Sequence, residues 1–213
     1  MTDRCGLCYW TPRDPRPMLA WIEAIQGYLD QQPQPDKVDG LIPCDRRVFE
    51  DDAFFCVVAN EPLAEGHVRV ICKHHLTDIG QLRGITSDDV DGAAVDAVRK
   101  NLLDDLIIAH DVVRGYDRRV THAVILSGTS PDLHMYADFV PVYRFDHGTL
   151  HTLGERAAVI KDQTLEEKRA RWKRQTDDFA ETAQRLREVA GRVIHSRPGR
   201  RRSGLIIGDE ADR

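Results

Sequence analysis

The chain has 213 residues, of which 41% are hydrophobic and 31% are charged, and its formal net charge is -5 at pH 7. This length fits one domain with additions, and the hydrophobic content is enough for an ordinary buried core. The sequence has no apolar run of about 18 residues and no basic and apolar leader, so we expect a cytoplasmic protein with no membrane contact. The acidic balance argues against nucleic-acid binding.

The cysteines suggest a metal ligand pair. Five cysteines, an odd number at uneven spacing, fit reduced thiols better than a disulfide framework. Cys5 and Cys8 are separated by two residues, so a short turn would let both thiolates reach one tetrahedral zinc ion. Two thiols without a metal are the alternative for this pair taken alone. A redox role would need a strand-to-helix setting, which residues 9–12 do not provide.

The segment after these cysteines predicts an added helix. Apolar residues recur at helical spacing over 17–29, and a proline stands just inside the start. The polar, proline-containing residues 31–36 are typical of a linker. We therefore expect residues 1–48 to hold the metal-ligand segment, an amphipathic helix and a linker.

The middle of the chain predicts a sheet and a helix. Residues 54–79 indicate two strands joined by a turn, with Gly66 and His67 opening the second strand, and residues 82–114 predict a long helix. In a strand over 133–141, polar residues alternate with apolar ones. Their side chains would therefore project from one face of that strand.

This order of strand, turn, strand, helix, strand, strand resembles the histidine triad (HIT) superfamily of nucleotide hydrolases and transferases. In that family three histidines alternate with apolar residues on the active-site strand, and a proline, here Pro141, closes the run. The triad positions correspond to His134, Tyr136 and Asp138, so the triad is degenerate and the position of the nucleophile holds a tyrosine. The resemblance covers most of a domain expected at 49–150. It implies an α+β fold, a HIT-like antiparallel sheet with a main helix, to which an N-terminal helix and a long C-terminal helix are added.

The resemblance also implies a structural zinc ion. Bacterial members of the family with zinc bind it through an N-terminal Cys-x-x-Cys pair, the histidine after the second central strand and the first histidine of the triad. The corresponding residues are Cys5, Cys8, His75 and His134. Four protein ligands fill a tetrahedral site, as in structural rather than catalytic zinc centres. His74 would replace His75 if the strand register differed by one residue.

The catalytic part of the resemblance is weaker. In active family members the middle histidine attacks the α-phosphorus of a nucleotide. A tyrosine hydroxyl, with an ordinary pKa of about 10, is almost wholly protonated at pH 7 and needs activation. Asp138, two residues along the same face, could accept the proton of Tyr136, or this hydroxyl could simply donate a hydrogen bond to Asp138 or to a ligand. A further possibility is that His122, on the preceding strand, has taken over the role of nucleophile.

Residues that would bind a ligand are small and polar. The phosphate-binding loop before the triad corresponds to residues 126–132, and the ribose-binding acid of the family falls near Ala59. Hydroxyl groups and backbone amides can donate hydrogen bonds to an anion, and a neighbouring amide side chain can replace the acid after a small register shift. The candidate ligand-binding residues are Asn60, Ser127, Gly128, Thr129 and Ser130.

The C-terminal part predicts a long helix over 164–194, with Thr164 as the N-cap and Glu167 completing a capping box. Apolar residues recur every seven positions, but the companion seam is mostly polar. The helix should therefore lie across its own domain or pair weakly with a second copy, so a homodimer is possible. Residues 151–195 form this extension, and the arginine-rich residues 196–213 are expected to be a flexible tail.

Three interpretations of function follow. The first is a zinc-stabilised HIT-like protein that binds a nucleotide or other phosphorylated ligand and lacks the usual histidine nucleophile. The second is a divergent hydrolase or nucleotidyltransferase that uses Tyr136 and Asp138. The third is a non-catalytic scaffold that acts through the long C-terminal helix.

Overall fold

The computed structural model describes residues 46–59, 62–74, 76, 82, 92–129, 135–143, 176–196 and 206–207, together with isolated residues between 155 and 170. The predicted helix over 17–29 lies outside these residues, as does the whole segment 1–45.

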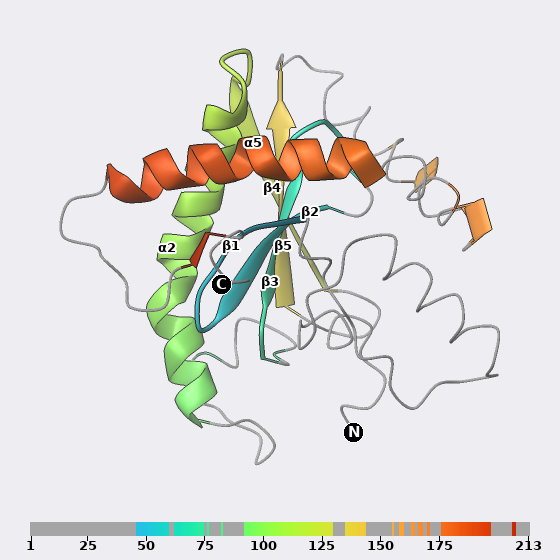
Figure 1. The fold of residues 1–213 in the computed structure, drawn as a ribbon. Coiled ribbons are helices and arrows are strands. Elements are labelled where there is room, and N and C mark those ends of the chain that lie inside the picture. Colours follow the sequence, from blue (N-terminus) through green and yellow to red (C-terminus); the bar gives the residue numbers. More distant parts are fainter. Residues whose placement is uncertain are drawn as a thin grey trace.

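Six strands of the described chain form one antiparallel sheet (Figure 1), with the order β4-β5-β3-β2-β1-β6. The strands are β1 (Arg47–Glu50), β2 (Phe54–Val58), β3 (Val68–Cys72), β4 (His122–Thr129), β5 (Met135–Val142) and β6 (Ile206–Ile207). The predicted pairing of the two central strands is confirmed, with Phe55 opposite Ile71. The short β6 belongs to the segment predicted to be a flexible tail. Its two isoleucines pair with β1 instead, because apolar residues after the arginines can extend the sheet edge.

Two helices lie on one face of this sheet and cross each other (Figure 1). Helix α2 (Gly92–Tyr116) covers residues 92–114 of the predicted range 82–114 and ends two residues beyond it. Helix α5 (Thr176–His195) ends one residue after its predicted end. The predicted capping box is confirmed. The amide of Glu167 donates to Oγ1 of Thr164 at 3.2 Å, and the amide of Thr164 donates to Oε2 of Glu167 at 2.7 Å.

The core lies between the helices and the sheet. Alternate residues of each central strand face the helices, as the two-residue period of a strand requires. The buried side chains from the sheet include Phe54, Cys56, Val58, Val68, Val70, Cys72 and Phe139, and those from the helices include Val95, Val98, Val112, Phe179, Leu186 and Val189. Arg187 of α5 fixes the helix to the sheet edge, since its Nε donates to the carbonyl of Arg47 at 2.8 Å.

Two thiols belong to this core. Cys56 of β2 and Cys72 of β3 are buried and form no disulfide bond. Burial raises the pKa of the Cys72 thiol to about 12 and raises the pKa of Cys56 well above its ordinary value, with the charge of Asp105 adding to the second shift. Both thiols therefore act as small hydrophobic side chains.

The turn between β2 and β3 is tied to α2 at one glycine. Gly66 has a φ of 80°, in the left-handed region that side chains other than glycine rarely adopt. A Cβ atom at this position would lie 2.7 Å from Cδ1 of Tyr116. Glycine is thus required here both by the backbone angle and by the close approach of the tyrosine ring.

Among the described residues, neither α2 nor α5 has the length and apolar character of a membrane-spanning helix.

We predict that Gly66→Ala lowers the free energy of unfolding by about 2 kcal/mol or more, because left-handed strain and overpacking each cost roughly 1 kcal/mol or more. Urea unfolding followed by circular dichroism measures this. Gly92→Ala is the matched control, since a Cβ atom there meets nothing within 4 Å and should leave the midpoint unchanged or slightly raised. Equal midpoints for both variants would contradict the role given to Gly66.

Candidate functional site

The second face of the sheet, opposite the helices, is mostly apolar and buried. Phe55, Val57, Ile71 and Val140 on this face are 0% to 4% exposed. Three residues with polar side-chain groups stand among these apolar residues, namely Arg69 of β3 and Tyr136 and Asp138 of β5. Together with His67, which precedes β3, we call them the sheet-face cluster.

An ion pair across two strands forms the centre of this cluster. In the register of β3 and β5, Arg69 stands directly opposite Asp138. Nε of Arg69 donates to Oδ1 of Asp138 at 2.6 Å, and the terminal nitrogen NH2 donates to Oδ2 at 2.7 Å. This two-pronged geometry is the strongest form of an arginine and carboxylate pair. Burial would raise the pKa of the Asp138 carboxyl, but the hydrogen bonds from Arg69 and the close approach of His67 outweigh this effect and lower the pKa from 3.8 to about 2.

His67 is the third partner of the carboxylate. Its ring is buried, and its Nδ1 accepts a hydrogen bond from the amide of Leu63 at 3.1 Å. The proton of the neutral ring therefore lies on Nε2, which is 3.3 Å from Oδ1 of Asp138, a contact that falls short of a regular hydrogen bond. Asp138 thus connects β3, β5 and the turn before β3.

Tyr136 lies on the same face, two residues from Asp138. The guanidinium carbon of Arg69 lies 4.4 Å from the centre of its ring, which is the geometry of a cation–π contact. The side chain of Arg69 is 31% exposed, so the positive charge is not sealed inside the protein. The predicted projection of Tyr136 and Asp138 from one face is consistent with this arrangement, in which Arg69 of the neighbouring strand β3 contacts both side chains. Their catalytic roles stay predictions.

All four predicted zinc ligands and two predicted ligand-binding residues lie outside the described residues. These are Cys5, Cys8, His75 and His134, together with Asn60 and Ser130. His74, the alternative to His75, is half-buried at the end of β3. The described part of the chain holds no group of three or more metal-ligating side chains. One described contact bears on the zinc prediction, because the amide of Met135 donates to the carbonyl of Leu76 at 2.7 Å.

The predicted phosphate-binding loop differs from the structure. Ser127, Gly128 and Thr129 are strand residues of β4, opposite Ala137, Tyr136 and Met135 of β5. Branched and hydroxyl residues fit a strand, so pairing with β5 continues where we expected a loop. In the described sheet β4 is an edge strand. Gly128 stands opposite Tyr136 of the sheet-face cluster, whereas Ser127 and Thr129 stand opposite Ala137 and Met135, which pack against the core on the helix side of the sheet.

His122 is remote from that cluster. It opens β4 with an exposed side chain and pairs with Val142, six residues along β5 from Tyr136. At a strand rise of about 3.3 Å per residue, this separation is roughly 20 Å. His122 therefore cannot replace a nucleophile at the position of Tyr136 within this arrangement.

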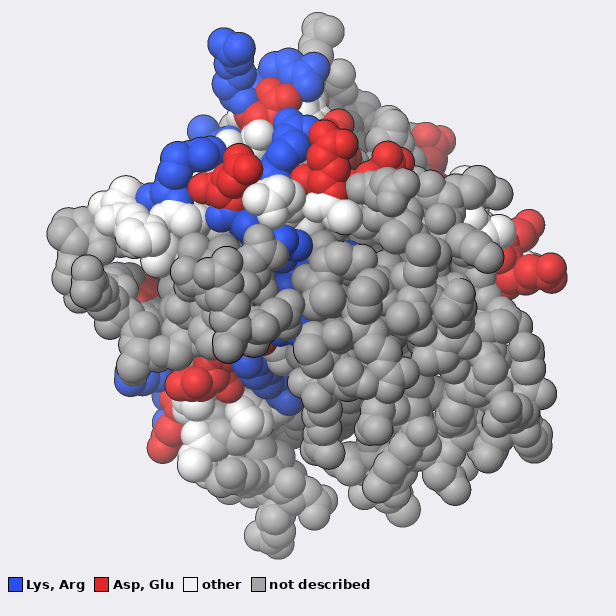
Figure 2. Space-filling view, in the orientation of Figure 1, with Lys and Arg blue, Asp and Glu red and all other residues white. Residues whose placement is uncertain are grey.

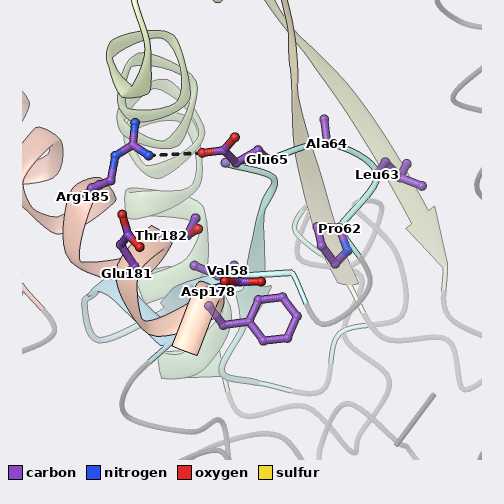
Figure 3. A pocket seen from close by; sticks show the side chains of 11 residues that line it. Val58, Pro62, Leu63, Ala64, Glu65, Asp178, Glu181, Thr182 and Arg185 are labelled. Atoms are coloured by element: carbon purple, nitrogen blue, oxygen red, sulfur yellow. Dashed lines mark hydrogen bonds and ion pairs between the residues drawn. The ribbon is translucent and has the colours of Figure 1, made fainter. Parts of the chain in front are cut away.

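A pocket of about 510 Å³ lies on the helix side of the sheet, between the turn 62–66 and α5. Figure 3 shows the turn on one side and residues of α5 on the other, with a hydrogen bond between Arg185 and Glu65 at its edge. The lining residues are Val58, Pro62, Leu63, Ala64, Glu65, Gly66, Asp178, Phe179, Glu181, Thr182 and Arg185. No sequence pattern pointed to this hollow.

Glu65 organises the edge of the pocket. Its Oε1 accepts hydrogen bonds from the hydroxyl of Tyr116 at 2.6 Å and from Arg185 at 3.2 Å, and Arg185 also lies over the ring of Tyr116. Burial and the bond to Glu65 raise the pKa of the Tyr116 hydroxyl. The hydroxyl of Tyr143 donates to the carbonyl of Glu65 at 2.9 Å. These contacts make the edge rigid, and they occupy its polar groups with one another.

Charge on the visible described surface is mixed. Figure 2 shows basic and acidic residues interleaved over the described part of this face, with no extended region of one sign. Arg119 and Asp117, for example, form a surface pair at 2.7 Å.

Comparisons with known proteins give a likeness of fold. No family model matches the chain, and no curated protein matches it. It is similar to a solved zinc-bound histidine triad family protein from Mycobacterium smegmatis, with 16% identity, a TM-score of 0.45, and coverage of 84% of this chain and 99% of that one. A HIT-like protein from Bartonella henselae involved in cell-cycle regulation matches with 15% identity, a TM-score of 0.41, and coverage of 68% and 85%.

A third similar structure is a hypothetical histidine triad nucleotide-binding protein from Sulfolobus tokodaii. It has 13% identity, a TM-score of 0.41, and coverage of 74% of this chain and 92% of that one. Identities of 13% to 16% with TM-scores below 0.5 do not establish a family. The histidine triad relationship of this chain therefore stays a resemblance.

We predict that Asp138→Asn lowers the free energy of unfolding at pH 7 by about 3 kcal/mol, because it removes one partner of a buried ion pair. The pKa shift of Asp138 corresponds to about 2 kcal/mol of stabilisation. Because its folded pKa is lowered, this stabilisation is complete above about pH 4 and is lost as the pH falls towards 2. The difference in free energy of unfolding between Asp138→Asn and the parent should therefore be smaller at pH 3 than at pH 7. Urea unfolding at the two pH values measures this.

Asp117→Asn is the control for this prediction. Asp117 also has a lowered pKa, of about 2, caused by hydrogen bonds from Arg119. The side chain of Arg119 is 73% exposed, so this surface pair should contribute little to stability. If Asp117→Asn lowered the free energy of unfolding as much as Asp138→Asn, burial of the ion pair would not be the cause of the stabilisation by Asp138.

Proposed function

We propose that this chain is a zinc-stabilised HIT-like protein that binds a nucleotide or other phosphorylated ligand at the sheet-face cluster and does not hydrolyse it in the manner of the family. The observation that carries the proposal is the two-pronged pair of Arg69 and Asp138 beside Tyr136. This arrangement bears on both halves of the proposal, which are the missing histidine nucleophile and the cations at the site.

The first half concerns the missing nucleophile. A tyrosine at the middle triad position needs a base to remove its proton. Asp138, the predicted base, accepts two hydrogen bonds from Arg69, and its pKa is about 2. A carboxylate with so low a pKa has little affinity for a proton. This favours binding without turnover over the alternative enzyme that uses Tyr136 and Asp138.

The second half concerns the cations at the site. Arg69 and Lys73 place two positive charges on the second face of the sheet, with side chains that are 31% and 24% exposed, and they are paired with Asp138 and Glu50 respectively. A phosphorylated ligand would have to share these cations with the two carboxylates. Guanidinium groups suit phosphate oxygens because their N–H groups form a planar fork. Of the proposed ligand contacts along β4, Gly128 stands opposite Tyr136, beside the cluster, while Ser127 and Thr129 stand opposite Ala137 and Met135, which pack on the helix side of the sheet. With Asn60 and Ser130, they form the set of residues that we propose for ligand binding.

The proposed zinc site contains Cys5, Cys8, His75 and His134. Two thiolates and two imidazoles are a donor set that zinc favours in structural sites. The hydrogen bond from the amide of Met135 to the carbonyl of Leu76 supports this grouping, because it places the residues that follow His134 and His75 side by side. When bound, zinc would cross-link the N-terminal segment to the sheet, and it would take no part in any reaction of the ligand.

We predict that the purified chain contains one zinc ion per molecule, and that Cys5→Ser loses it, because one of four ligands is removed. Elemental analysis combined with native mass spectrometry measures the metal and any phosphorylated molecule that co-purifies. Cys44→Ser is the matched control and should keep its zinc, since Cys44 is not in the proposed set. Zinc retained in Cys5→Ser, or absent from the parent chain, would exclude these ligands.

We predict that the parent chain binds ATP or AMP without converting it, and that Tyr136→Phe binds within about threefold of the parent, because only a hydroxyl is lost. Titration calorimetry measures the affinity, and phosphorus NMR of the same mixtures detects products. Tyr143→Phe, which removes a hydroxyl bonded to the turn, is the control for loss of a tyrosine hydroxyl.

Two outcomes of this experiment would change the proposal. Turnover by the parent that disappears in Tyr136→Phe but not in Tyr143→Phe would select the enzyme interpretation. Absence of both binding and turnover with intact zinc would select the scaffold interpretation, in which the C-terminal helix carries the function.

A further inference from the structure

The pocket between the turn 62–66 and α5 has the size of a small-molecule site. Its volume of about 510 Å³ falls within the range of roughly 300 to 1,000 Å³ that is usual for such sites. It lies on the helix side of the sheet, whereas the sheet-face cluster lies on the second face. A molecule in this pocket would therefore not overlap the ligand of the proposed function.

The buried lining residues give the pocket an apolar floor. Val58, Leu63 and Phe179 form this floor, and each is at most 8% exposed. Arg46 holds two of them in place. Its guanidinium carbon lies 5.0 Å from the centre of the Phe179 ring, and its terminal nitrogen NH2 donates to the carbonyl of Val58. Because these side chains already have fixed positions, an apolar group can bind on the floor without the cost of ordering them.

Helix α5 supplies a polar wall. Four of its residues line the pocket at intervals of three or four positions, so they share one stripe of the helix, namely Asp178, Glu181, Thr182 and Arg185. Figure 3 shows this stripe across the pocket from the turn, where Glu65 accepts a hydrogen bond from Arg185 at 3.2 Å. These two charges therefore balance each other.

The two acids of the stripe have no such partner. Asp178 and Glu181 are exposed, and neither forms a hydrogen bond or an ion pair with another residue of the described chain. Within the same part of the chain there is no group of three or more side chains that could hold a metal ion. Their charges are thus available to a molecule in the pocket, and their spacing does not suit a metal ion.

The charge of the lining selects the kind of molecule. Three carboxylates, Glu65, Asp178 and Glu181, and one guanidinium, Arg185, line the pocket. Three negative charges less one positive charge leave a formal excess of two negative charges. Arg46 is 1% exposed and does not line the pocket, so its charge is below the floor. A phosphate or carboxylate would be repelled here, whereas an ammonium group would be attracted.

We propose that this pocket binds a small organic cation, an amine with a compact apolar body. The apolar body lies on the floor of Val58, Leu63 and Phe179. The ammonium group lies at the opening, beside Asp178 and Glu181, and the hydroxyl of Thr182 on the same stripe can accept a hydrogen bond from it. The chain then has two ligand sites of opposite charge preference on opposite faces of one sheet.

A titration of the full chain with phenethylamine, followed by two-dimensional amide NMR at pH 7, tests the proposal. This amine is protonated at that pH, since the ordinary pKa of an alkyl ammonium group is about 10. We expect saturable shifts with a dissociation constant of about 1 mM, which is usual for so small a ligand. The shifts should lie at residues 63–66 and 178–185 and be absent from residues 135–138. Lack of saturation up to about 20 mM, or shifts confined to β5, would overturn the proposal.

Removal of the acids tests the role of charge. Glu181→Gln should weaken phenethylamine binding about threefold, and adding Asp178→Asn should bring the loss to about tenfold, because each change removes an ion pair with the ammonium group. Glu188→Gln is the matched control, since Glu188 is an exposed glutamate of α5 that does not line the pocket. Its affinity should equal that of the parent. An unchanged affinity in the double variant, or an equal loss in Glu188→Gln, would exclude recognition of the cation by these acids.

Two analogues with a similar body separate charge from shape. Phenylpropionate carries a carboxylate and should bind at least about tenfold more weakly than phenethylamine, while the neutral phenethyl alcohol should lie between them. Equal affinities for all three compounds would mean that the pocket recognises only the apolar body, and the proposal of a cation site would be wrong.

Discussion

The carboxylate of Asp138 is the constraint on which the described structure depends most. A charge on a mostly buried sheet face must be paired, because an unpaired one would cost several kcal/mol, on the order of 3 to 5. Arg69 and His67 meet this requirement, and each comes from the chain just before or within β3. The register between β3 and β5, the direction of the Tyr136 ring and the position of the turn before β3 are therefore fixed by one side chain.

The turn transmits this constraint to the other side of the sheet. His67 accepts a hydrogen bond from the amide of Leu63, and Leu63 lines the pocket beneath α5. Gly66, in the same turn, allows the ring of Tyr116 to approach closely. The sheet-face cluster and the pocket thus share this turn although they lie on opposite faces of the sheet.

Local patterns predicted the elements whose signals are local. The central strand pair, the long helix, the capping box of Thr164 and Glu167, and the shared face of Tyr136 and Asp138 all follow from periodicity or from short motifs. The partner of Asp138 did not follow, because Arg69 is 69 residues away in sequence and only strand register brings the two together. A single arginine between valines in a strand was the available signal. The pocket depends on the placement of α5 against a turn, which no local pattern specifies.

The two core cysteines make the remaining ones chemically distinct. Thiolates react with alkylating reagents and thiols do not, and the raised pKa values of Cys56 and Cys72 keep both protonated at neutral pH. Cys56 and Cys72 should therefore stay unlabelled in the folded chain and react only after it unfolds. If the proposed zinc ligands Cys5 and Cys8 are labelled before and after chelation, the core pair adds no background to that measurement until the protein unfolds.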